Sequence, residues 1–156
     1  MFQLEIPGFG KVELEHLVTD YTGTLSQDGR LLPGVRERLE EVSQFLKVHV
    51  LTADTFGMAR EELQRLDLQV FVLEGPDHHI QKREYVKKLG SQHVFAMGNG
   101  MNDVLMLKEA KIGVAVLLAE GVSARAVEAA DILVSSALDA LDLLLKPKRL
   151  KATLRY

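Results

Sequence analysis

The sequence of 156 residues contains no cysteine, which excludes disulfide bonds, thiolate zinc sites and cysteine nucleophiles. Long apolar runs are also missing: residues 112–119 form one of the longest, well short of the ~20 residues that cross a bilayer. The first residues have neither the basic nor the long apolar region of a signal peptide. Charge of one sign is not in excess, because 19 Lys and Arg stand beside 22 Asp and Glu, and this balance argues against nucleic-acid binding. We therefore expect a soluble, cytoplasmic protein with no membrane or nucleic-acid partner.

The residues that are present fit one globular domain. Hydrophobic residues make up 47% of the chain and charged residues 26%, close to the average for globular proteins and far from disorder. Surface scaling predicts that a chain of this length buries roughly two-thirds of its surface on folding, which is enough for one core. Because no internal repeat or low-complexity segment is visible, we expect residues 1–156 to form a single domain.

Short apolar runs alternate along the chain with stretches of helical periodicity. A β-hairpin is predicted first, with arms at 2–6 and 11–16 around a turn at 7–10, and its second arm continues to Asp20. Further strands are predicted at residues 48–52, 69–73, 93–97, 112–116 and 131–134. Helices are predicted at residues 35–45, 59–66, 78–89, 101–110, 123–129 and 137–145. Asp77 is the expected N-cap of the helix at 78–89, and Pro147 is expected to end the last one.

This alternation is typical of right-handed βαβ units. It predicts an α/β fold of three layers, a doubly wound and mostly parallel Rossmann-like sheet with helices on both faces, preceded by the small hairpin. In such folds ligands bind beyond the carboxyl ends of the strands, so the residues that follow each strand are the candidates for chemistry.

Polar groups follow three of the predicted strands, at residues 20–24, 52–55 and 98–103, and Lys82 lies near the start of a helix. This set suits phosphoryl transfer to the carboxylate of Asp20, since hydroxyl, ammonium and loop N–H groups bind phosphate oxygens. A carboxylate nucleophile needs a divalent cation, because its charge otherwise repels the phosphate that it attacks. Oxygen ligands without His or Cys indicate Mg²⁺.

These segments, in this order, resemble the haloacid dehalogenase-like (HAD) phosphohydrolases and, more narrowly, the phosphorylation domain of P-type cation ATPases. The similar segments are DYTGT at residues 20–24 for D-K-T-G-T, LTADT at 51–55 for the T-G-D segment, K-x-x-x-V-x-x-L at 82–89 for the third motif, and GNGMND at 98–103 for G-D-G-x-N-D. Residues 110–115 and 129–131 also fit, so the resemblance runs from about Leu14 to Leu145. It is strongest to the stand-alone, soluble P-type ATPase-like phosphatases of prokaryotes, and it implies a HAD-like core with no cap domain.

The resemblance implies a role for each matched residue in phosphate chemistry. Asp20 is the expected nucleophile, which forms an aspartyl-phosphate. Thr52 and Lys82 are expected to take part in catalysis by binding the phosphoryl oxygens. Further phosphate contacts are expected from Thr22, Gly23 and Ala53.

The same resemblance implies a Mg²⁺ site built from oxygen ligands. The expected ligands are Asp20, the backbone carbonyl of Thr22, Asn99 and Asp103, and Asp103 is also expected to orient Lys82.

Two of the departures from the family pattern bear on catalysis and metal binding. Most HAD phosphatases carry a second Asp, which serves as general acid and base, where this chain has Thr22. Because a hydroxyl cannot serve as that base, and such help is worth ~10²–10⁴ in rate, slow turnover and a long-lived phosphoenzyme are expected. The second departure is Asn99, where the motif has a metal-binding Asp, so weaker Mg²⁺ binding is expected.

Some of the motif residues have a structural interpretation as well. Thr24 is expected to cap the turn after the first strand, and Asp54 is either a helix cap or a ligand. Lys87 and Lys88 are alternatives to Lys82 on the same helix.

Other candidates are assigned to structure. Asn102 fits a helix cap, and the adjacent His78 and His79 do not share a helix face, so solvated side chains are expected. The basic tail at 146–151 is expected to be a solvated terminus or a subunit contact.

The spacing between motifs also bears on function. Only residues 25–51 separate Thr24 from Thr52, and the stretch from Thr55 to Lys82 is equally short. Neither interval holds the nucleotide-binding domain of the ATPases or a cap domain, which excludes ATP-driven transport. An open site of this kind implies a large substrate or a lid from neighbouring subunits. The hairpin residues Phe2, Leu4, Ile6 and Phe9 are candidates for such assembly.

The sequence therefore predicts a Mg²⁺-dependent phosphatase that acts through an aspartyl-phosphate on a phosphorylated small molecule or phosphoprotein. Two alternatives stay open. One is a capless, tetrameric sugar-phosphate phosphatase, and the other is a non-catalytic phosphate-binding or regulatory module that retains the fold.

Overall fold

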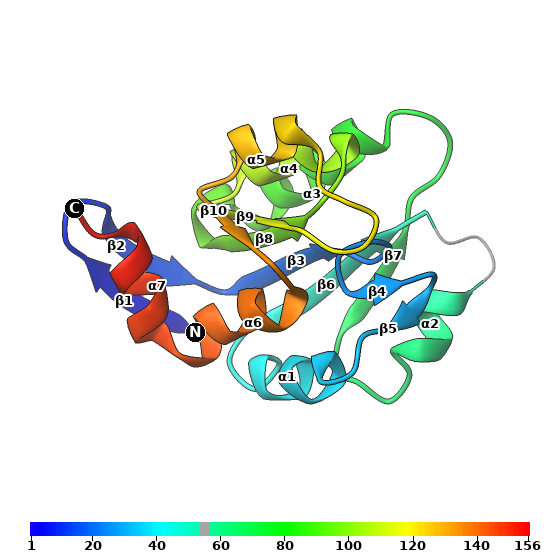
Figure 1. Ribbon diagram of the computed structural model, residues 1–156, viewed down its shortest axis with the longest axis horizontal. Helices are drawn as coiled ribbons and strands as arrows, with labels where there is room; N and C mark the ends of the chain where they lie inside the picture. The colour runs from blue at the N-terminus through cyan, green and yellow to red at the C-terminus, as the bar shows by residue number, and fades with distance from the viewer. Residues whose placement is uncertain (54–56) are drawn as a thin grey trace.

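A six-stranded parallel sheet with strand order β10-β9-β8-β3-β6-β7 forms the centre of the molecule (Figure 1). The computed structural model describes residues 1–53 and 57–156. The strands of the sheet are β3 (His16–Asp20), β6 (Lys47–Thr52), β7 (Gln69–Val72), β8 (Val94–Gly98), β9 (Ile112–Val116) and β10 (Ile132–Val134). β3 pairs with β6 on one side and with β8 on the other, so the direction of winding changes at β3. This change opens a crevice at the carboxyl edge, where β3 and β8 end.

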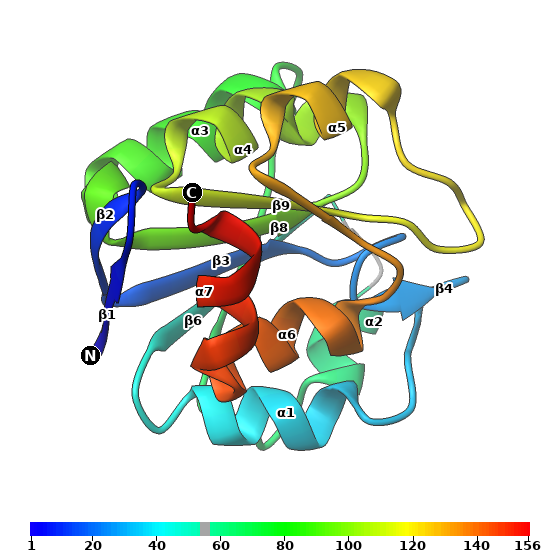
Figure 2. The same cartoon turned by 60° about the vertical axis from the view of Figure 1, so that its left-hand side comes forward.

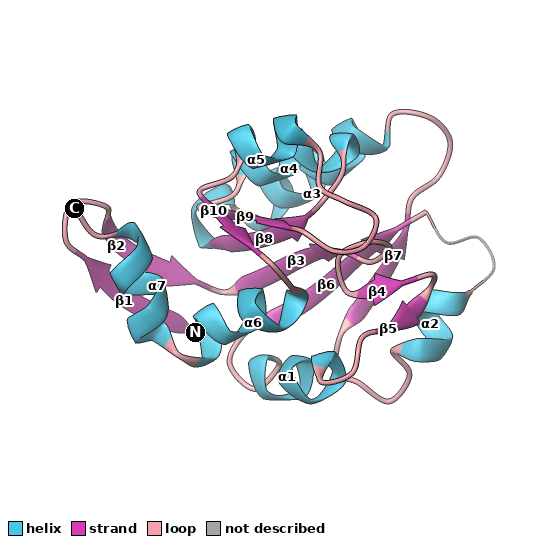
Figure 3. Cartoon of the chain, viewed as in Figure 1, coloured by secondary structure: helices cyan, strands magenta, loops and turns pink. Residues whose placement is uncertain are grey.

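Helices cover both faces of the sheet and make three layers (Figure 3). One face carries α3 (His78–Leu89), α4 (Val104–Glu109) and α5 (Ala124–Ala129), and the other carries α1 (Val35–Val42), α2 (Met58–Glu62) and α6 (Ala137–Leu145). Because helices exclude water from both sides, β3, β8 and β9 are buried along their whole lengths. The predicted doubly wound α/β class is confirmed.

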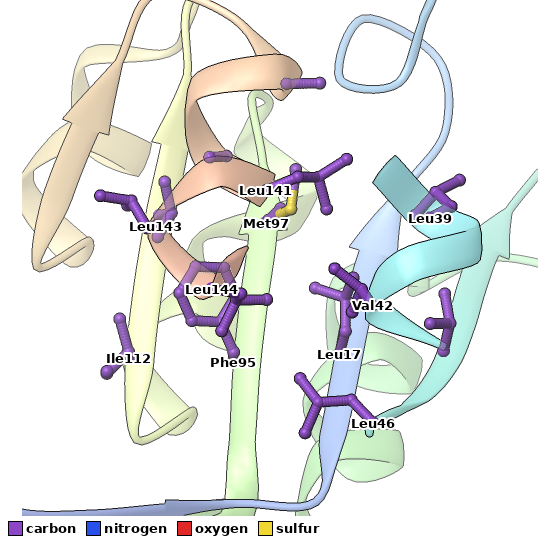
Figure 4. Packing of buried hydrophobic residues seen from close by; sticks show 14 of the residues in the cluster. Leu17, Leu39, Val42, Leu46, Phe95, Met97, Ile112, Leu141, Leu143 and Leu144 are labelled. Carbon is purple, nitrogen blue, oxygen red and sulfur yellow. The ribbon is translucent and has the colours of Figure 1, made fainter. Parts of the chain in front are cut away.

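The larger core lies between the sheet and the pair α1 and α6. Leu39 and Val42 of α1 face Leu17 of β3, while Leu141 and Leu144 of α6 lie over β8 (Figure 4). All five side chains are at most 1% exposed. This packing fixes β3 and β8, the strands whose ends carry the motifs.

The N-terminal hairpin consists of β1 (Phe2–Ile6) and β2 (Gly10–Leu14), paired from Phe2↔Leu14 to Ile6↔Gly10. Its turn needs Gly8, which has φ +83° and lies against the backbone oxygen of Tyr156. Phe2 and Ile6 are buried within the chain itself, so of the four hairpin residues proposed for assembly only Leu4 and Phe9 keep partial exposure.

The basic tail forms a helix that was not predicted, α7 (Pro147–Leu154), and residues 146–149 are exposed, as expected for a solvated terminus. α7 packs beside β1, as Figures 1 and 2 show, and its Leu150 is fully buried. Pro147 does follow the end of α6, as expected, but it also begins α7, since the first turn of a helix needs no N–H from that residue. The four-residue spacing of Leu150 and Leu154 is the helical pattern within the basic run.

Several boundaries differ from the prediction. The helix expected at 101–110 is a 3₁₀ turn, η2 (Met101–Asp103), followed by α4, and His93 belongs to the 3₁₀ turn η1 (Ser91–His93) that precedes β8. A short hairpin of β4 (Ser26–Gln27) and β5 (Arg30–Leu31) was not anticipated, because two-residue strands carry no periodicity. Asp77 occupies the N-cap position of α3, but at φ +64° its side chain makes no capping hydrogen bond.

Within residues 1–53 and 57–156, no helix combines the length and the apolar character needed to span a bilayer.

Candidate active site

The carboxyl ends of β3, β6 and β8 surround a cavity of about 470 Å³. The predicted site residues that line it are Asp20, Thr22, Thr52, Ala53, Lys82 and Asn99. A cavity of about 550 Å³ between α1 and α2 holds none of them. The parallel sheet thus brings together side chains that are up to 79 positions apart in the sequence.

Lys82 is the buried lysine of α3, with 1% of its side chain exposed. Its Nζ donates hydrogen bonds to Asp103 Oδ1 at 2.7 Å, Asp20 Oδ1 at 3.0 Å and Asn102 Oδ1 at 3.3 Å. Burial alone lowers the pKa of this ammonium, but the charges of the two carboxylates outweigh burial and raise the pKa above its ordinary value. The alternatives Lys87 and Lys88 are exposed, so Lys82 is the lysine of α3 that reaches the cavity.

Asp20 ends β3 and is 9% exposed. Burial and the nearby charge of Asp103 raise the pKa of its carboxyl to about 7, although Lys82 acts in the opposite direction. Two carboxylates therefore share one ammonium, and the group carries an uncompensated negative charge when all three are ionised.

Asp103 lies beneath the cavity and is fully buried. Its Oδ1 accepts the hydrogen bond of Lys82, and its Oδ2 accepts those of the Asn99 and Gly100 N–H groups at 2.9 and 3.0 Å. Gly98 is required here, because a Cβ on it would lie 2.5 Å from Asp103 Cγ. Asp103 thus holds both the lysine and the loop after β8 in place, and its role as a metal ligand stays a prediction.

Asn99 and Thr24 face Asp20 from the other side. The fully buried hydroxyl of Thr24 donates to Asp20 Oδ2 at 3.3 Å and lies 3.4 Å from Asn99 Oδ1. Asn99 Nδ2 donates to the Gly121 carbonyl at 3.3 Å, while its Oδ1 faces the Thr24 hydroxyl. Thr24 was expected only to cap the turn; its place in DYTGT, four residues after Asp20, was the available indication of a site contact.

Gly23 permits this close packing. It has φ +77°, and a Cβ on it would lie 2.5 Å from Asn99 Nδ2 and 2.6 Å from Glu120 Oε2. Glu120 lines the cavity together with Leu73 and Met101. Sequence reasoning missed these three residues: Leu73 and Glu120 lie in loops outside the four motifs, and Met101 stands at the variable position of GNGMND.

Thr52 and Ala53 complete the cavity at the end of β6. Thr52 is buried, and its carbonyl accepts a hydrogen bond from the Leu73 N–H at 2.7 Å. Asp54, considered as a cap or ligand, lies outside the described residues. At the opposite loop Tyr21, which replaces the motif lysine, donates its hydroxyl hydrogen to the Gly29 carbonyl at 2.8 Å and so ties the β4–β5 turn to the end of β3.

Comparisons with known proteins identify similar sequences and similar folds. The profile of the haloacid dehalogenase-like hydrolases matches residues 77–139, which include Lys82 and the loop after β8. An uncharacterised protein of Methanocaldococcus jannaschii is 44% identical over 72 residues, 46% of this chain and 77% of that protein. A probable copper-exporting P-type ATPase of Archaeoglobus fulgidus is 32% identical over 96 residues, 60% of this chain but only 12% of that protein.

Among solved structures, 3-deoxy-D-manno-octulosonate 8-phosphate phosphatase from Moraxella catarrhalis, in complex with magnesium, phosphate and the sugar acid, has a TM-score of 0.72. It is 17% identical, and the alignment covers 91% of this chain and 94% of that one. The fold is therefore shared over nearly the full length of both chains. The chain belongs to the haloacid dehalogenase-like hydrolase family.

Proposed function

We propose that this protein is a Mg²⁺-dependent phosphatase that hydrolyses phosphoric monoesters through an aspartyl-phosphate on Asp20. The observation that carries the proposal is the contact of Asp20 Oδ1 with Lys82 at 3.0 Å, at the carboxyl edge of the sheet and beside a cavity. An ammonium in this position binds oxygens of a phosphoryl group as it reaches the carboxylate.

The donor set fits a hard divalent cation. Asp20 Oδ2 and Asn99 Oδ1 face the same hydroxyl, that of Thr24, and the backbone carbonyl of Thr22 is the third expected ligand. All three are oxygen donors, which Mg²⁺ prefers, and the ionised Asp20, Asp103 and Lys82 together carry one net negative charge. When bound, Mg²⁺ supplies positive charge that offsets the repulsion between carboxylate and phosphate.

The chain's own residues then carry out two displacements. In the first, an Asp20 carboxylate oxygen attacks phosphorus, the bond from phosphorus to the ester oxygen breaks, and the alcohol leaves after taking a proton from water. In the second, water attacks phosphorus, the bond between phosphorus and the carboxylate oxygen breaks, and phosphate leaves with Asp20 restored. Thr22 offers no base for the second step, so we infer that it is slow.

Trapping of the phosphoenzyme tests this proposal. With Mg²⁺ and ³²P-acetyl phosphate, the native protein is expected to retain acid-stable label that hydroxylamine releases, as an acyl phosphate does. Asp20→Asn is expected to retain none, whereas the exposed control Asp67→Asn labels like the native protein. Absence of label from the native protein across several phosphodonors would contradict the enzyme and favour the phosphate-binding module.

A second candidate is the capless sugar-phosphate phosphatase, which the shared fold with the Moraxella enzyme favours. It predicts a tetramer in light scattering and a preference for sugar phosphates, 3-deoxy-D-manno-octulosonate 8-phosphate among them, over aryl phosphates. A monomer without that preference would reject this candidate and leave the first one standing.

A further inference from the structure

We propose that Glu120 supplies the negative charge that Asn99 lacks, and that it thereby takes part in binding the divalent cation of this site. The inference rests on the proposed Mg²⁺ site and assigns to it a residue outside the four motifs. Asn99 leaves the cavity one carboxylate short of the G-D-G-x-N-D pattern.

The position of Glu120 carries the first step. It lines the same cavity as Asp20, Thr22 and Asn99. Its Oε2 lies 2.6 Å from the point where a Cβ on Gly23 would stand, and Asn99 Nδ2 lies 2.5 Å from that point. The carboxylate and the amide therefore pack against the same side of Gly23, next to the carbonyl-bearing Thr22.

The loop that carries Glu120 is fixed to Asn99. The Asn99 side chain donates to the Gly121 carbonyl at 3.3 Å, and its backbone carbonyl accepts from the Ser123 N–H at 2.8 Å. A turn closed by the hydrogen bond from the Gly121 N–H to the Leu118 carbonyl, at 2.8 Å, presents Glu120 between these anchors. The loop thus positions a carboxylate beside Asn99, the position at which the motif has lost a carboxylate.

The charge of Glu120 is available to a cation. In the parts of the chain that the structure describes, no Lys or Arg forms an ion pair with it, and residues 54–56 contain no basic residue. Lys82, the ammonium of this cavity, is already hydrogen-bonded to Asp20, Asn102 and Asp103. At the separations within one cavity, an unpaired carboxylate attracts a divalent ion appreciably even at a partly exposed site.

Magnesium binding without substrate tests the inference. Isothermal titration with MgCl₂, repeated with Mn²⁺ detected by electron paramagnetic resonance, gives Kd without any turnover. Glu120→Gln is expected to weaken binding about 10-fold, the lower end of the effect seen for groups that support a metal site. The exposed Glu128→Gln on the neighbouring α5 is the matched control and is expected to bind like the native protein.

A double variant that moves the carboxylate from position 120 to position 99 tests whether Glu120 compensates for Asn99. Asn99→Asp is expected to tighten binding, and the double variant Asn99→Asp with Glu120→Gln is expected to bind within about twofold of the native protein, a difference below 0.5 kcal/mol. Thermal unfolding verifies that each variant is folded.

Each result decides between the two proposals. If the native protein and Glu120→Gln bind Mg²⁺ equally, or if Asn99→Asp does not restore binding to Glu120→Gln, the role of Glu120 is overturned while the Mg²⁺ site stands. If the native protein binds no Mg²⁺, the site itself and the proposed function fail. If Glu120→Gln leaves Mg²⁺ binding unchanged and alters only KM for esters with a cationic leaving group, Glu120 contacts the substrate and the inference is overturned.

Discussion

At the scale of single residues, the central feature of the site is one ammonium group that is hydrogen-bonded to two carboxylates. Lys82 is shared by Asp20 and Asp103, and Asp103 in turn holds the N–H groups of Asn99 and Gly100. Removing one member leaves a buried charge or N–H group without its partner, which costs more than the lost contact alone. Thr22 stands apart from this network, because it is exposed at the cavity, and it is therefore the residue at which the chemistry can be altered without disturbing the others.

Replacement of Thr22 by Asp tests whether the missing carboxylate makes the phosphoenzyme long-lived. Thr22→Asp is expected to shorten the lifetime of the phosphoenzyme by about 10²-fold or more, because a carboxylate can accept a proton from the attacking water. Thr22→Asn, equal in size but without an acid, is the control and is expected to keep the native lifetime. Chase of the ³²P label with unlabelled donor measures both rates, and equal lifetimes for Asp and Asn would show that another step limits turnover.

At the scale of elements, prediction succeeded for helices and strands with a continuous hydrophobic pattern. It failed for elements whose burial depends on contacts with distant parts of the chain. The strand at 112–116 and the helix at 137–145 were predicted with the bounds that β9 and α6 have, since each is a continuous apolar or amphipathic run. α7 was missed because the charges of residues 146–151 hid Leu150, which is buried only through contact with distant β1. The cavity residues at the strand ends could be predicted because the alternation of strands and helices places these ends at one edge of the sheet. The position of Glu120 could not, because it depends on the path of the loop after β9.

The contact between β3 and β6 contains a pair of buried histidines that is separate from the cavity. His16 of β3 lies 3.0 Å from His49 of β6 (Nδ1 to Nε2), and His49 Nδ1 lies 2.8 Å from the hydroxyl of Tyr85 on α3. Burial, with repulsion from His16 and Lys47, lowers the pKa of His49 to about 4, and burial also lowers the pKa of His16. Both imidazoles are therefore neutral in the folded protein at pH 7.

This contact predicts how acid changes stability. The unfolded chain takes up a proton at His49 near pH 6.5, whereas the folded chain takes it up only near pH 4. Protonation therefore favours the unfolded chain, so the free energy of unfolding is highest above pH 6.5 and decreases as the pH falls toward 4. We expect the free energy of unfolding to fall by roughly 2 kcal/mol over this interval on account of His49. Urea unfolding of native protein and His49→Leu between pH 7 and 5 measures the difference, with the exposed His79→Gln as control. If the free energy of unfolding changes with pH equally in the native protein and in His49→Leu, the prediction is refuted.

At the scale of the whole molecule, the intervals between motifs define an open site. β4, β5 and α1 occupy the chain between β3 and β6, and no further domain stands over the cavity in the described residues. Besides the residues predicted to bind phosphate or metal, the described side chains at the cavity are Leu73, Met101, Asn102 and Glu120. A leaving group bound here stays largely in contact with water, so it gains little binding energy from the protein.

Substrate selectivity measures the consequence of that openness. For the protein as a monomer, kcat/KM across uncharged leaving groups of matched pKa is expected to vary by less than about tenfold, or 1.4 kcal/mol, because a solvated leaving group adds little transition-state binding. Light scattering at the assay concentration establishes the oligomeric state. Strong selectivity in a monomer would contradict an open site. Strong selectivity that disappears on dilution below the assembly range would instead show that a neighbouring chain contributes the lid, because only then does discrimination depend on protein concentration.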